Sequence, residues 1–217
     1  SDLLAGLMTI SGRTELRFLY IDIGTNGEIL VGHKGKFWAA SAAAGPAFEG
    51  GAISSGMRAD AGAIDRVRWQ NGALDFHVLG QIPARGICGS GIIDLVGCLL
   101  EAGCLDANGI FTDAAGEKLT MRSGNRGAEL LLCTQGGAEV SFNQDDVRQV
   151  QLAKSAIRTA TEVLLGQAGL KLRDLDVVIL AGAFGSYIDP EQAIRIGLLP
   201  ELEPGLIKNV GNAAAQG

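Results

Sequence analysis

The chain carries Asp22-Ile23-Gly24-Thr25-Asn26-Gly27-Glu28 between two apolar runs, Phe18-Leu19-Tyr20-Ile21 before it and Ile29-Leu30-Val31 after it. This order predicts two strands joined by a hairpin, and Asn-Gly is among the strongest short hairpin signals. In a phosphate-binding hairpin, glycines admit backbone N–H groups to the phosphate, Thr and Asn add donors, and a carboxylate can hold Mg²⁺ through water. An ordinary turn beside a solvated Asp22 explains the same residues, so this stretch alone leaves both interpretations open.

The composition excludes several classes of protein. The 217 residues suggest one domain of generous size or two small ones, and 47% apolar residues are enough for a core. We find no apolar run long enough to span a membrane and no secretory signal. A net charge of −6 argues against a nucleic-acid surface. We therefore expect no nucleic acid and no membrane among the partners.

The four cysteines are spaced in a way that does not suggest a metal site. Cys88, Cys98, Cys104 and Cys133 form no C-x-x-C pair, and the sequence has only two histidines. An iron–sulfur or structural zinc site within this chain is therefore not expected. Reduced thiols in a cytoplasmic protein are the simplest explanation.

Around the opening stretch, the pattern predicts a three-stranded antiparallel meander. We expect strands at 16–23, 28–33 and 36–42, with Lys34-Gly35 at the second turn. Small residues follow, and among them Glu49 is an isolated acid. Glu49 is either a solvated loop carboxylate or a group that faces the same ligand as Asp22.

Further along, a second hairpin (64–69 and 74–79) precedes Gly89-Ser90-Gly91, which opens a helix that should end near Gly103. A Gly-Ser-Gly helix start can bind an anion because free N–H groups and the helix dipole point to one place. A Ser N-cap without a ligand explains the same residues.

The remaining third predicts a β-rich insertion at about 106–142, with no evident chemistry, and then the longest helix, from Asn143 to about 168. A buried strand at 176–180 runs into Gly182-Ala183-Phe184-Gly185. Glycines at the carboxyl end of such a strand mark the place where open α/β sheets bind ligands. A helix beginning at Asp189-Pro190 and a short strand at 207–210 complete the chain.

Together, these loops occur in an order that resembles one half of the actin, heat-shock chaperone and sugar-kinase superfamily of ATPases. Seven blocks narrow the resemblance to the C-terminal part of the reductive activators of corrinoid proteins. They are Asp22-Ile-Gly-Thr-Asn-Gly-Glu28, Ala44-Gly-Pro-Ala-Phe-Glu-Gly50, Ile87-Cys-Gly-Ser-Gly-Ile-Ile-Asp94, Gln151-Leu-Ala-Lys-Ser-Ala-Ile-Arg158, Leu180-Ala-Gly-Ala-Phe-Gly185, Tyr187-Ile-Asp-Pro190 and Arg195-Ile-Gly-Leu-Leu-Pro200.

This resemblance implies a fold and a function. The fold is α/β, a ribonuclease-H-like lobe of the actin-like ATPase fold, with a mixed sheet, flanking helices and the small β-rich insert. Residues 1–217 would be a single ATPase-type lobe and a fragment of a larger protein. Full-length members resemble a [2Fe–2S] domain joined to an ATPase domain, which uses ATP to drive an electron onto a cobalt(II) corrinoid and restore cobalt(I). The cluster would lie outside this chain, and the fragment alone is expected to be inactive.

The resemblance also implies roles for individual residues. Asp22 would hold Mg²⁺ or position water, and Glu49 would polarise water. ATP would be bound by the following residues: Gly24, Thr25, Asn26, Gly27, Gly89, Ser90, Gly91, Gly182, Ala183, Phe184 and Gly185. The implied partners are a corrinoid protein, the missing N-terminal domains of the same protein and a second copy of the chain.

Two alternative functions remain open. The chain could be a lobe of a related activator that delivers electrons to a dehydratase or an acyl-CoA reductase. Such activators resemble dimers that bridge a cluster with their own cysteines, and Cys88 is the cysteine beside a predicted ligand loop. The chain could also be a non-enzymatic docking module for the corrinoid protein.

Overall fold

The computed structural model describes residues 16–133, 139–182 and 188–210. The chain divides into two compact units. One combines residues 1–45 with 154–217, and the other comprises residues 46–153. The chain therefore leaves the first unit after its N-terminal strands and returns to it within a long helix.

The first unit is built on a five-stranded mixed sheet with the order β11-β10-β1-β2-β3. β1 pairs antiparallel with β2, and β2 with β3, so the predicted meander is confirmed. β10 runs parallel to both β1 and β11. The strands are β1 (Phe18–Ile23), β2 (Gly27–His33), β3 (Lys36–Ala42), β10 (Val177–Ala181) and β11 (Ile207–Asn209).

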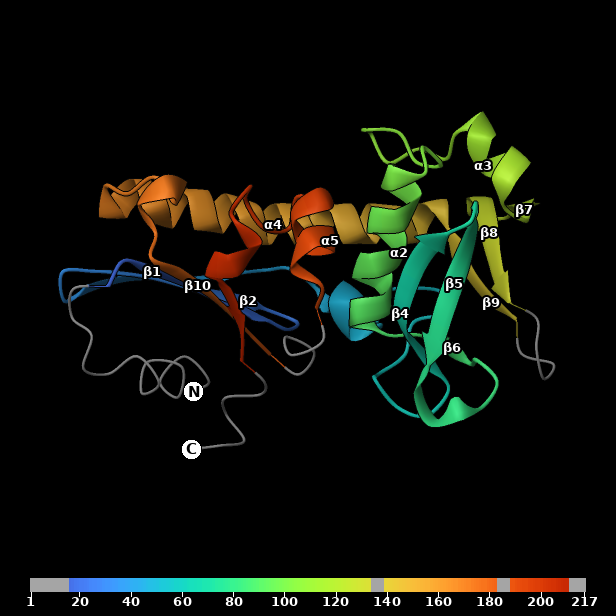
Figure 1. The fold of residues 1–217 in the computed structure, drawn as a ribbon, viewed down its shortest axis with the longest axis horizontal. Coiled ribbons are helices and arrows are strands. Elements are labelled where there is room, and N and C mark those ends of the chain that lie inside the picture. The colour runs from blue at the N-terminus through green and yellow to red at the C-terminus, as the bar shows by residue number, and fades with distance from the viewer. Residues whose placement is uncertain (1–15, 134–138, 183–187, 211–217) are drawn as a thin grey trace. The chain divides into compact units, whose positions relative to one another are not determined.

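Two helical segments lie on the same side of this sheet (Figure 1): residues 154–168 of α4 (Gln144–Ala168) and α5 (Pro190–Arg195). On the facing strand surface, Leu19, Ile21 and Leu180 are each 0% exposed. Lys154 Nζ donates to the carbonyl of Ile196 over 2.6 Å. Burial, and then the nearby Arg158, lower the pKa of Lys154. This lysine therefore joins α4 to the end of α5 and does not point to a ligand.

The first hairpin differs from the predicted Asn-Gly turn. Ile23 pairs with Gly27, so the loop is Gly24-Thr25-Asn26 and Gly27 already belongs to β2. Gly27 is not among the residues with positive φ. Asn71 and Gly72 show the expected turn geometry in the second hairpin, with φ of 52° and 79°.

Gly27 is a glycine for a different reason. A Cβ at this position would lie 2.7 Å from Cγ1 of Ile157 on α4, closer than packed carbon atoms approach. Packing between α4 and the sheet therefore requires a glycine at this position, whereas the sequence pattern attributes it to an Asn-Gly turn.

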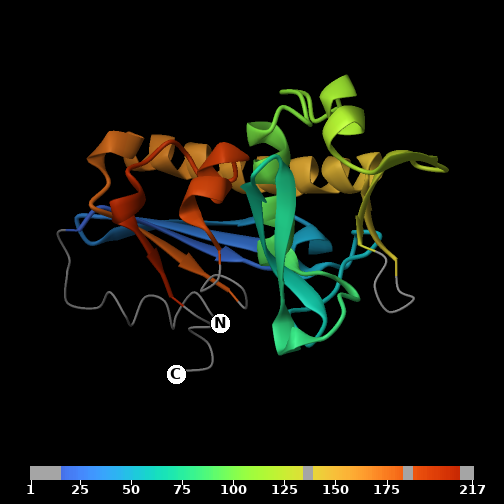
Figure 2. The ribbon, with the colours of Figure 1, turned by 45° about the vertical axis from the view of Figure 1, so that its right-hand side comes forward.

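The second unit contains two three-stranded sheets, β5-β4-β6 and β7-β8-β9. Helix α2 packs on β4 (Figure 2). The strands are β4 (Ala63–Gln70), β5 (Ala73–Val78), β6 (Gly86–Ile87), β7 (Met121–Gly124), β8 (Gly127–Cys133) and β9 (Val140–Asn143). The helices are α2 (Gly89–Glu101) and α3 (Asp113–Lys118), and α4 also contributes its residues up to 153.

The predicted helix ends are largely confirmed. Gly103 and Gly169 have φ of 70° and 69°, as expected for residues that end a helix. Asn143 Oδ1 accepts from the backbone of Asp146 at the start of α4. Helix α3, within the insertion, was not predicted, because six residues with Ala115 alone buried show no apolar periodicity. Among the described residues, no helix is long and apolar enough to cross a membrane.

Candidate functional site

Asp22 lies near the carboxyl end of β1, the central strand of the five-stranded sheet. In the parallel pairing with β10, Asp22 is opposite Ala181, and Gly182 follows directly. The carboxyl ends of two parallel strands are therefore adjacent, which is where open α/β sheets bind ligands. Two of the predicted segments, the acidic hairpin and the start of the glycine turn, meet at this edge.

The contact between Asp22 and Gly182 is close. Gly182 has a φ of +111°, a conformation that side chains disfavour. A Cβ there would lie 2.5 Å from the carbonyl oxygen of Ile23 and 3.0 Å from Asp22 Oδ1. Only glycine therefore allows the end of β10 to approach this carboxylate so closely. The predicted residues Ala183, Phe184 and Gly185 lie outside the described residues.

The other oxygen of Asp22 has a different neighbour. The hydroxyl of Tyr20 donates to Asp22 Oδ2 across 3.3 Å, and Tyr20 is 0% exposed. On the far side of the hairpin, Glu28 is directly opposite Asp22 in the antiparallel register. The loop between them exposes Thr25 and Asn26. One sheet edge thus combines a tethered carboxylate with an exposed polar loop, the chemistry required to hold a phosphate and a divalent cation.

In the second unit, the Gly-Ser-Gly start of α2 is largely explained by packing. Ser90 is not the N-cap, which is Cys88. The Ser90 hydroxyl donates to the carbonyl of Asp65 on β4 at 2.8 Å, and a Cβ on Gly91 would lie 2.3 Å from the carbonyl oxygen of Ile64. The serine and this glycine therefore let α2 lie against β4. A ligand at this helix start remains a prediction.

Glu49 is the last residue of a short 3₁₀ turn, Pro46–Glu49, and its side chain is exposed. This turn contacts α2. Gly50, with a φ of +79°, follows it and lies against Met57, where a Cβ would be 2.5 Å from the backbone nitrogen. The second unit thus brings the turn that carries Glu49 onto the helix that begins at Gly89.

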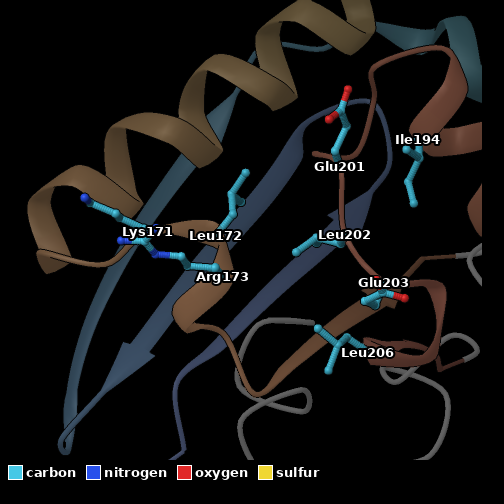
Figure 3. Close-up of a pocket in the computed structure, with 8 residues that line it drawn as sticks. All are labelled: Lys171, Leu172, Arg173, Ile194, Glu201, Leu202, Glu203 and Leu206. Carbon is cyan, nitrogen blue, oxygen red and sulfur yellow. The ribbon is translucent and has the colours of Figure 1, made fainter.

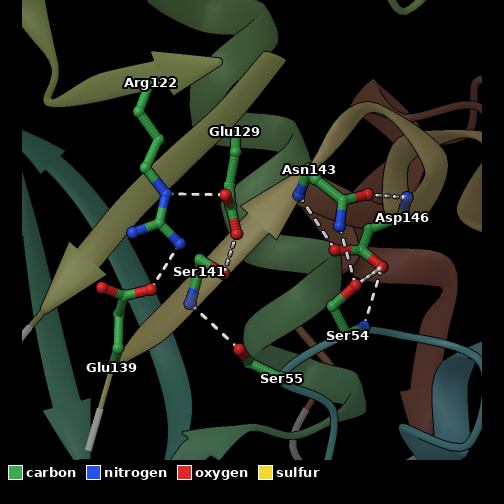
Figure 4. Close-up of polar contacts among 8 residues, drawn as sticks. All are labelled: Ser54, Ser55, Arg122, Glu129, Glu139, Ser141, Asn143 and Asp146. Carbon is green, nitrogen blue, oxygen red and sulfur yellow. Dashed lines mark hydrogen bonds and ion pairs between the residues drawn. The ribbon is translucent and has the colours of Figure 1, made fainter. Parts of the chain in front are cut away.

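A buried polar network that the sequence did not reveal anchors the adjoining loop to α4 (Figure 4). Asp146, 1% exposed, accepts from the backbone N–H of Ser54 at 2.8 Å and of Asn143 at 2.9 Å. The Ser54 hydroxyl also donates to it, at 3.1 Å. Burial raises the pKa of Asp146, while these hydrogen bonds act in the opposite direction. A capping box at the start of α4 was a visible signal, but the partner Ser54 lies 92 residues away in sequence.

Arg122 extends the polar contacts of this region. Its Nε donates to Glu129 at 2.7 Å, and it also pairs with Glu139 (Figure 4). Ser141 then connects Glu129 to the loop that carries Ser54. Its hydroxyl donates to the Glu129 carboxylate at 2.6 Å, and its backbone N–H donates to the hydroxyl of Ser55 at 3.0 Å. These contacts fasten the β7-β8-β9 sheet to the loop and indicate a structural role.

A cavity of about 780 Å³ lies in the first unit (Figure 3). Its walls include Lys171 and Arg173, which precede β10, and Leu206, which precedes β11. The amino ends of these strands are opposite to the edge that holds Asp22 and Gly182. This cavity is therefore not the place where the predicted ligand residues gather.

In the described part of the chain, no three His, Cys, Asp or Glu side chains are grouped to hold a metal ion. Cys88, Cys98 and Cys104 are buried, and all four cysteines are free thiols. These cysteines do not fit an iron–sulfur cluster. The single carboxylate of Asp22 fits a cation that is held by one carboxylate together with phosphates and water, as Mg²⁺ usually is.

Comparison with known proteins identifies the same fold. Residues 17–217 match the family described as the C-terminal domain of RACo, the ASKHA domain, which has the actin-like ATPase fold. The solved structure of a reductive activator for a corrinoid, iron–sulfur protein superposes with a TM-score of 0.90 at 36% identity, covering 98% of this chain and 35% of that protein.

Two curated relatives share the whole chain or most of it. The corrinoid activation enzyme RamQ of Eubacterium limosum is 40% identical, over 100% of this chain and 38% of its own length. The [Co(II) methylated amine-specific corrinoid protein] reductase of Methanosarcina barkeri is 32% identical, over 84% of this chain and 34% of its own length. The chain thus spans little more than a third of each relative.

Proposed function

This chain belongs to the family of the C-terminal ASKHA domain of RACo, and on that premise we propose that it is the nucleotide-binding lobe of an ATP-dependent reductive activator. The larger protein would return cobalt(II) corrinoid proteins of methyltransferase systems to cobalt(I). The observation that supports this most directly is the adjacency of Asp22 and Gly182 at the carboxyl ends of β1 and β10.

In this proposal, residues 1–217 act as one lobe, and each predicted residue contributes by position or charge. Asp22 orients water or holds the cation, while Gly24 to Gly27 offer donors to the phosphates. Gly182 brings the backbone of β10 against the nucleotide, together with Ala183, Phe184 and Gly185. Glu49 would polarise water, and Gly89 to Gly91 would flank the nucleotide. Such positioning and charge neutralisation account for most of the catalysis in phosphoryl transfer.

Two cofactors are part of the proposal. Mg²⁺, held through Asp22, would neutralise charge on the phosphates of ATP. A [2Fe–2S] cluster would supply the electron, but three of the four cysteines are buried and the described residues hold no group of side chains that could ligate it. We therefore assign the cluster to other domains of the larger protein, and we derive no step through it.

The proposed partner is a corrinoid protein, because the names of both curated relatives refer to the activation or reduction of corrinoid proteins. The alternative as an activator of a dehydratase or an acyl-CoA reductase depends on Cys88 reaching a bridging cluster. Cys88 is 2% exposed and lies against the Ser90 hydroxyl, which does not favour that role. A cytoplasmic location and a homodimer remain parts of the proposal.

Replacing Asp22 by Ala in the full-length protein tests this function. We expect ATP turnover to fall by about 100-fold or more, since removing one preorganised charge at a phosphoryl-transfer site typically costs this much. Asp176→Ala is the matched control, because Asp176 pairs with Arg17 before β10, at the opposite end of the strand. Unchanged turnover in Asp22→Ala, or equal losses in both variants, would show that the hairpin is not the phosphate site.

A docking module that binds no nucleotide makes a different prediction. Isothermal titration of the full-length protein should detect Mg-ATP binding that Asp22→Ala weakens. Binding of the corrinoid protein without any binding of Mg-ATP would favour the docking module instead.

A further inference from the structure

Tyr20 contacts Asp22 and lies outside the set of predicted site residues. The two residues are two positions apart on β1, so their side chains project from the same face of the sheet. The Tyr20 hydroxyl donates to Asp22 Oδ2 at 3.3 Å. We propose that Tyr20 is a positioning residue that holds the Asp22 carboxylate in the orientation that ATP hydrolysis requires. This inference rests on the proposed function of Asp22.

The ring of Tyr20 is fixed by its surroundings. Tyr20 is 0% exposed and belongs to a buried cluster with Phe18, Leu30, Ile179 and Ala181. In the sheet, Leu30 on β2 and Ile179 on β10 are its direct neighbours on either side. A ring enclosed in this way cannot turn its hydroxyl to bulk water. The direction of the donor is therefore set by packing before any ligand arrives.

The hydroxyl itself needs an explanation, because a phenylalanine would fill the same apolar space. Burying a hydroxyl costs free energy unless it is hydrogen-bonded. Asp22 also faces Glu28 directly across the hairpin, and like charges at opposed positions of a sheet repel each other. A donor on Oδ2 offsets this repulsion and ties the carboxylate to the sheet.

The two oxygens of Asp22 thus have separate surroundings. Oδ2 is next to the Tyr20 hydroxyl, whereas Oδ1 lies beside Gly182, close to where a Cβ would be. Anchoring Oδ2 directs Oδ1 to the strand end at which the nucleotide is proposed to bind.

Tyr20→Phe in the full-length protein tests the inference, since it removes only the hydroxyl. We expect kcat for ATP hydrolysis to fall about tenfold, the usual effect of losing one hydrogen bond to a charged group. KM for ATP should stay within about twofold of the wild type, because the hydroxyl orients Asp22 and is not proposed to contact the nucleotide itself.

Phe18→Leu is the matched control. Phe18 belongs to the same cluster and the same sheet face but begins β1, whereas Asp22 lies near its other end, so this variant should reduce thermal stability and leave kcat and KM unchanged. A Tyr20→Phe protein with the wild-type kcat would overturn the inference, as would a Phe18→Leu protein with the same loss of kcat. Either result together with an inactive Asp22→Ala would leave the proposed function intact, so the two failures are distinguishable.

Discussion

Gly27 shows how a single residue type can satisfy two different demands. In the sequence it completes an Asn-Gly pair, whereas in the structure it lies within β2 beneath α4. The missing side chain leaves space for Ile157, which is 0% exposed. The choice of glycine beside the proposed phosphate loop is therefore determined by packing against α4.

We predict that Gly27→Ala destabilises the chain by about 1–3 kcal/mol, because the added methyl group overpacks a filled site. Urea unfolding followed by circular dichroism measures this difference. The loss should largely disappear in an Ile157→Ala background, where the clashing carbon is absent. Gly166→Ala is the control: a Cβ added to Gly166 in α4 would meet no other part of the chain within 4 Å, and the substitution should stabilise by about 0.5–1 kcal/mol. An equal loss in both Ile157 backgrounds would contradict this explanation.

At the scale of elements, α4 is organised from its first turn. Asn143 and Asp146 cap each other, and the same Asp146 carboxylate accepts two hydrogen bonds from Ser54. One buried acid therefore starts the helix and also holds the loop that follows the Glu49 turn. Loss of this acid should affect both elements together.

This dual role predicts a particular dependence of stability on pH. Burial raises the pKa of Asp146, so between about pH 4 and the raised value the folded protein binds this proton more readily than the unfolded chain. The contribution of Asp146 to the free energy of unfolding should therefore decrease as pH rises through that window. Asp146→Asn cannot ionise and should lack this slope.

Urea unfolding of the wild type and of Asp146→Asn between pH 4.5 and 7.5, a range of about three units chosen to cover the window, measures the difference. We expect Asp146→Asn to be less stable by about 1–3 kcal/mol, since an acceptor becomes a donor facing a buried N–H. The difference in the free energy of unfolding between the two proteins should narrow as pH rises. A gap that widens with pH would mean that the hydrogen bonds outweigh the burial of the carboxylate.

At the scale of the whole molecule, the two compact units divide the proposed work. Unit one carries Asp22 and Gly182, and unit two carries Glu49, Gly89 and all four cysteines. The chain corresponds to 38% and 34% of its two curated relatives. We therefore propose that residues of this chain carry out the nucleotide chemistry and that other parts of the larger protein supply the electron.

The burial of Cys88, Cys98 and Cys104 leads to a prediction about cluster binding by the isolated chain. After anaerobic incubation with iron and sulfide, it should hold no stoichiometric cluster and should not convert a cobalt(II) corrinoid protein to cobalt(I), as followed by absorbance. The full-length protein should hold a cluster and, in the presence of ATP, should convert the cobalt(II) corrinoid protein to cobalt(I). A stable cluster on the isolated chain would favour the alternative activator class, in which Cys88 contributes a ligand.

The sequence by itself determined the strands of the meander, the long helix with its cap and terminating glycine, and the family of the chain. These features depend on local periodicity, on turn and cap residues, and on the order of short motifs. The sequence also proposed Asp22 and Gly182 as candidate ligand residues, Asp22 from the polar glycine hairpin that follows it and Gly182 from its place after a buried strand.

Only the tertiary structure decided why particular residues stand where they do. Gly27 and Gly91 are required by neighbours on elements distant in the sequence, and Ser90 donates to a strand rather than capping a helix. The hydrogen bond from Ser54 to Asp146 joins residues 92 positions apart. Contacts of this kind depend on packing between elements, which neither composition nor periodicity encodes.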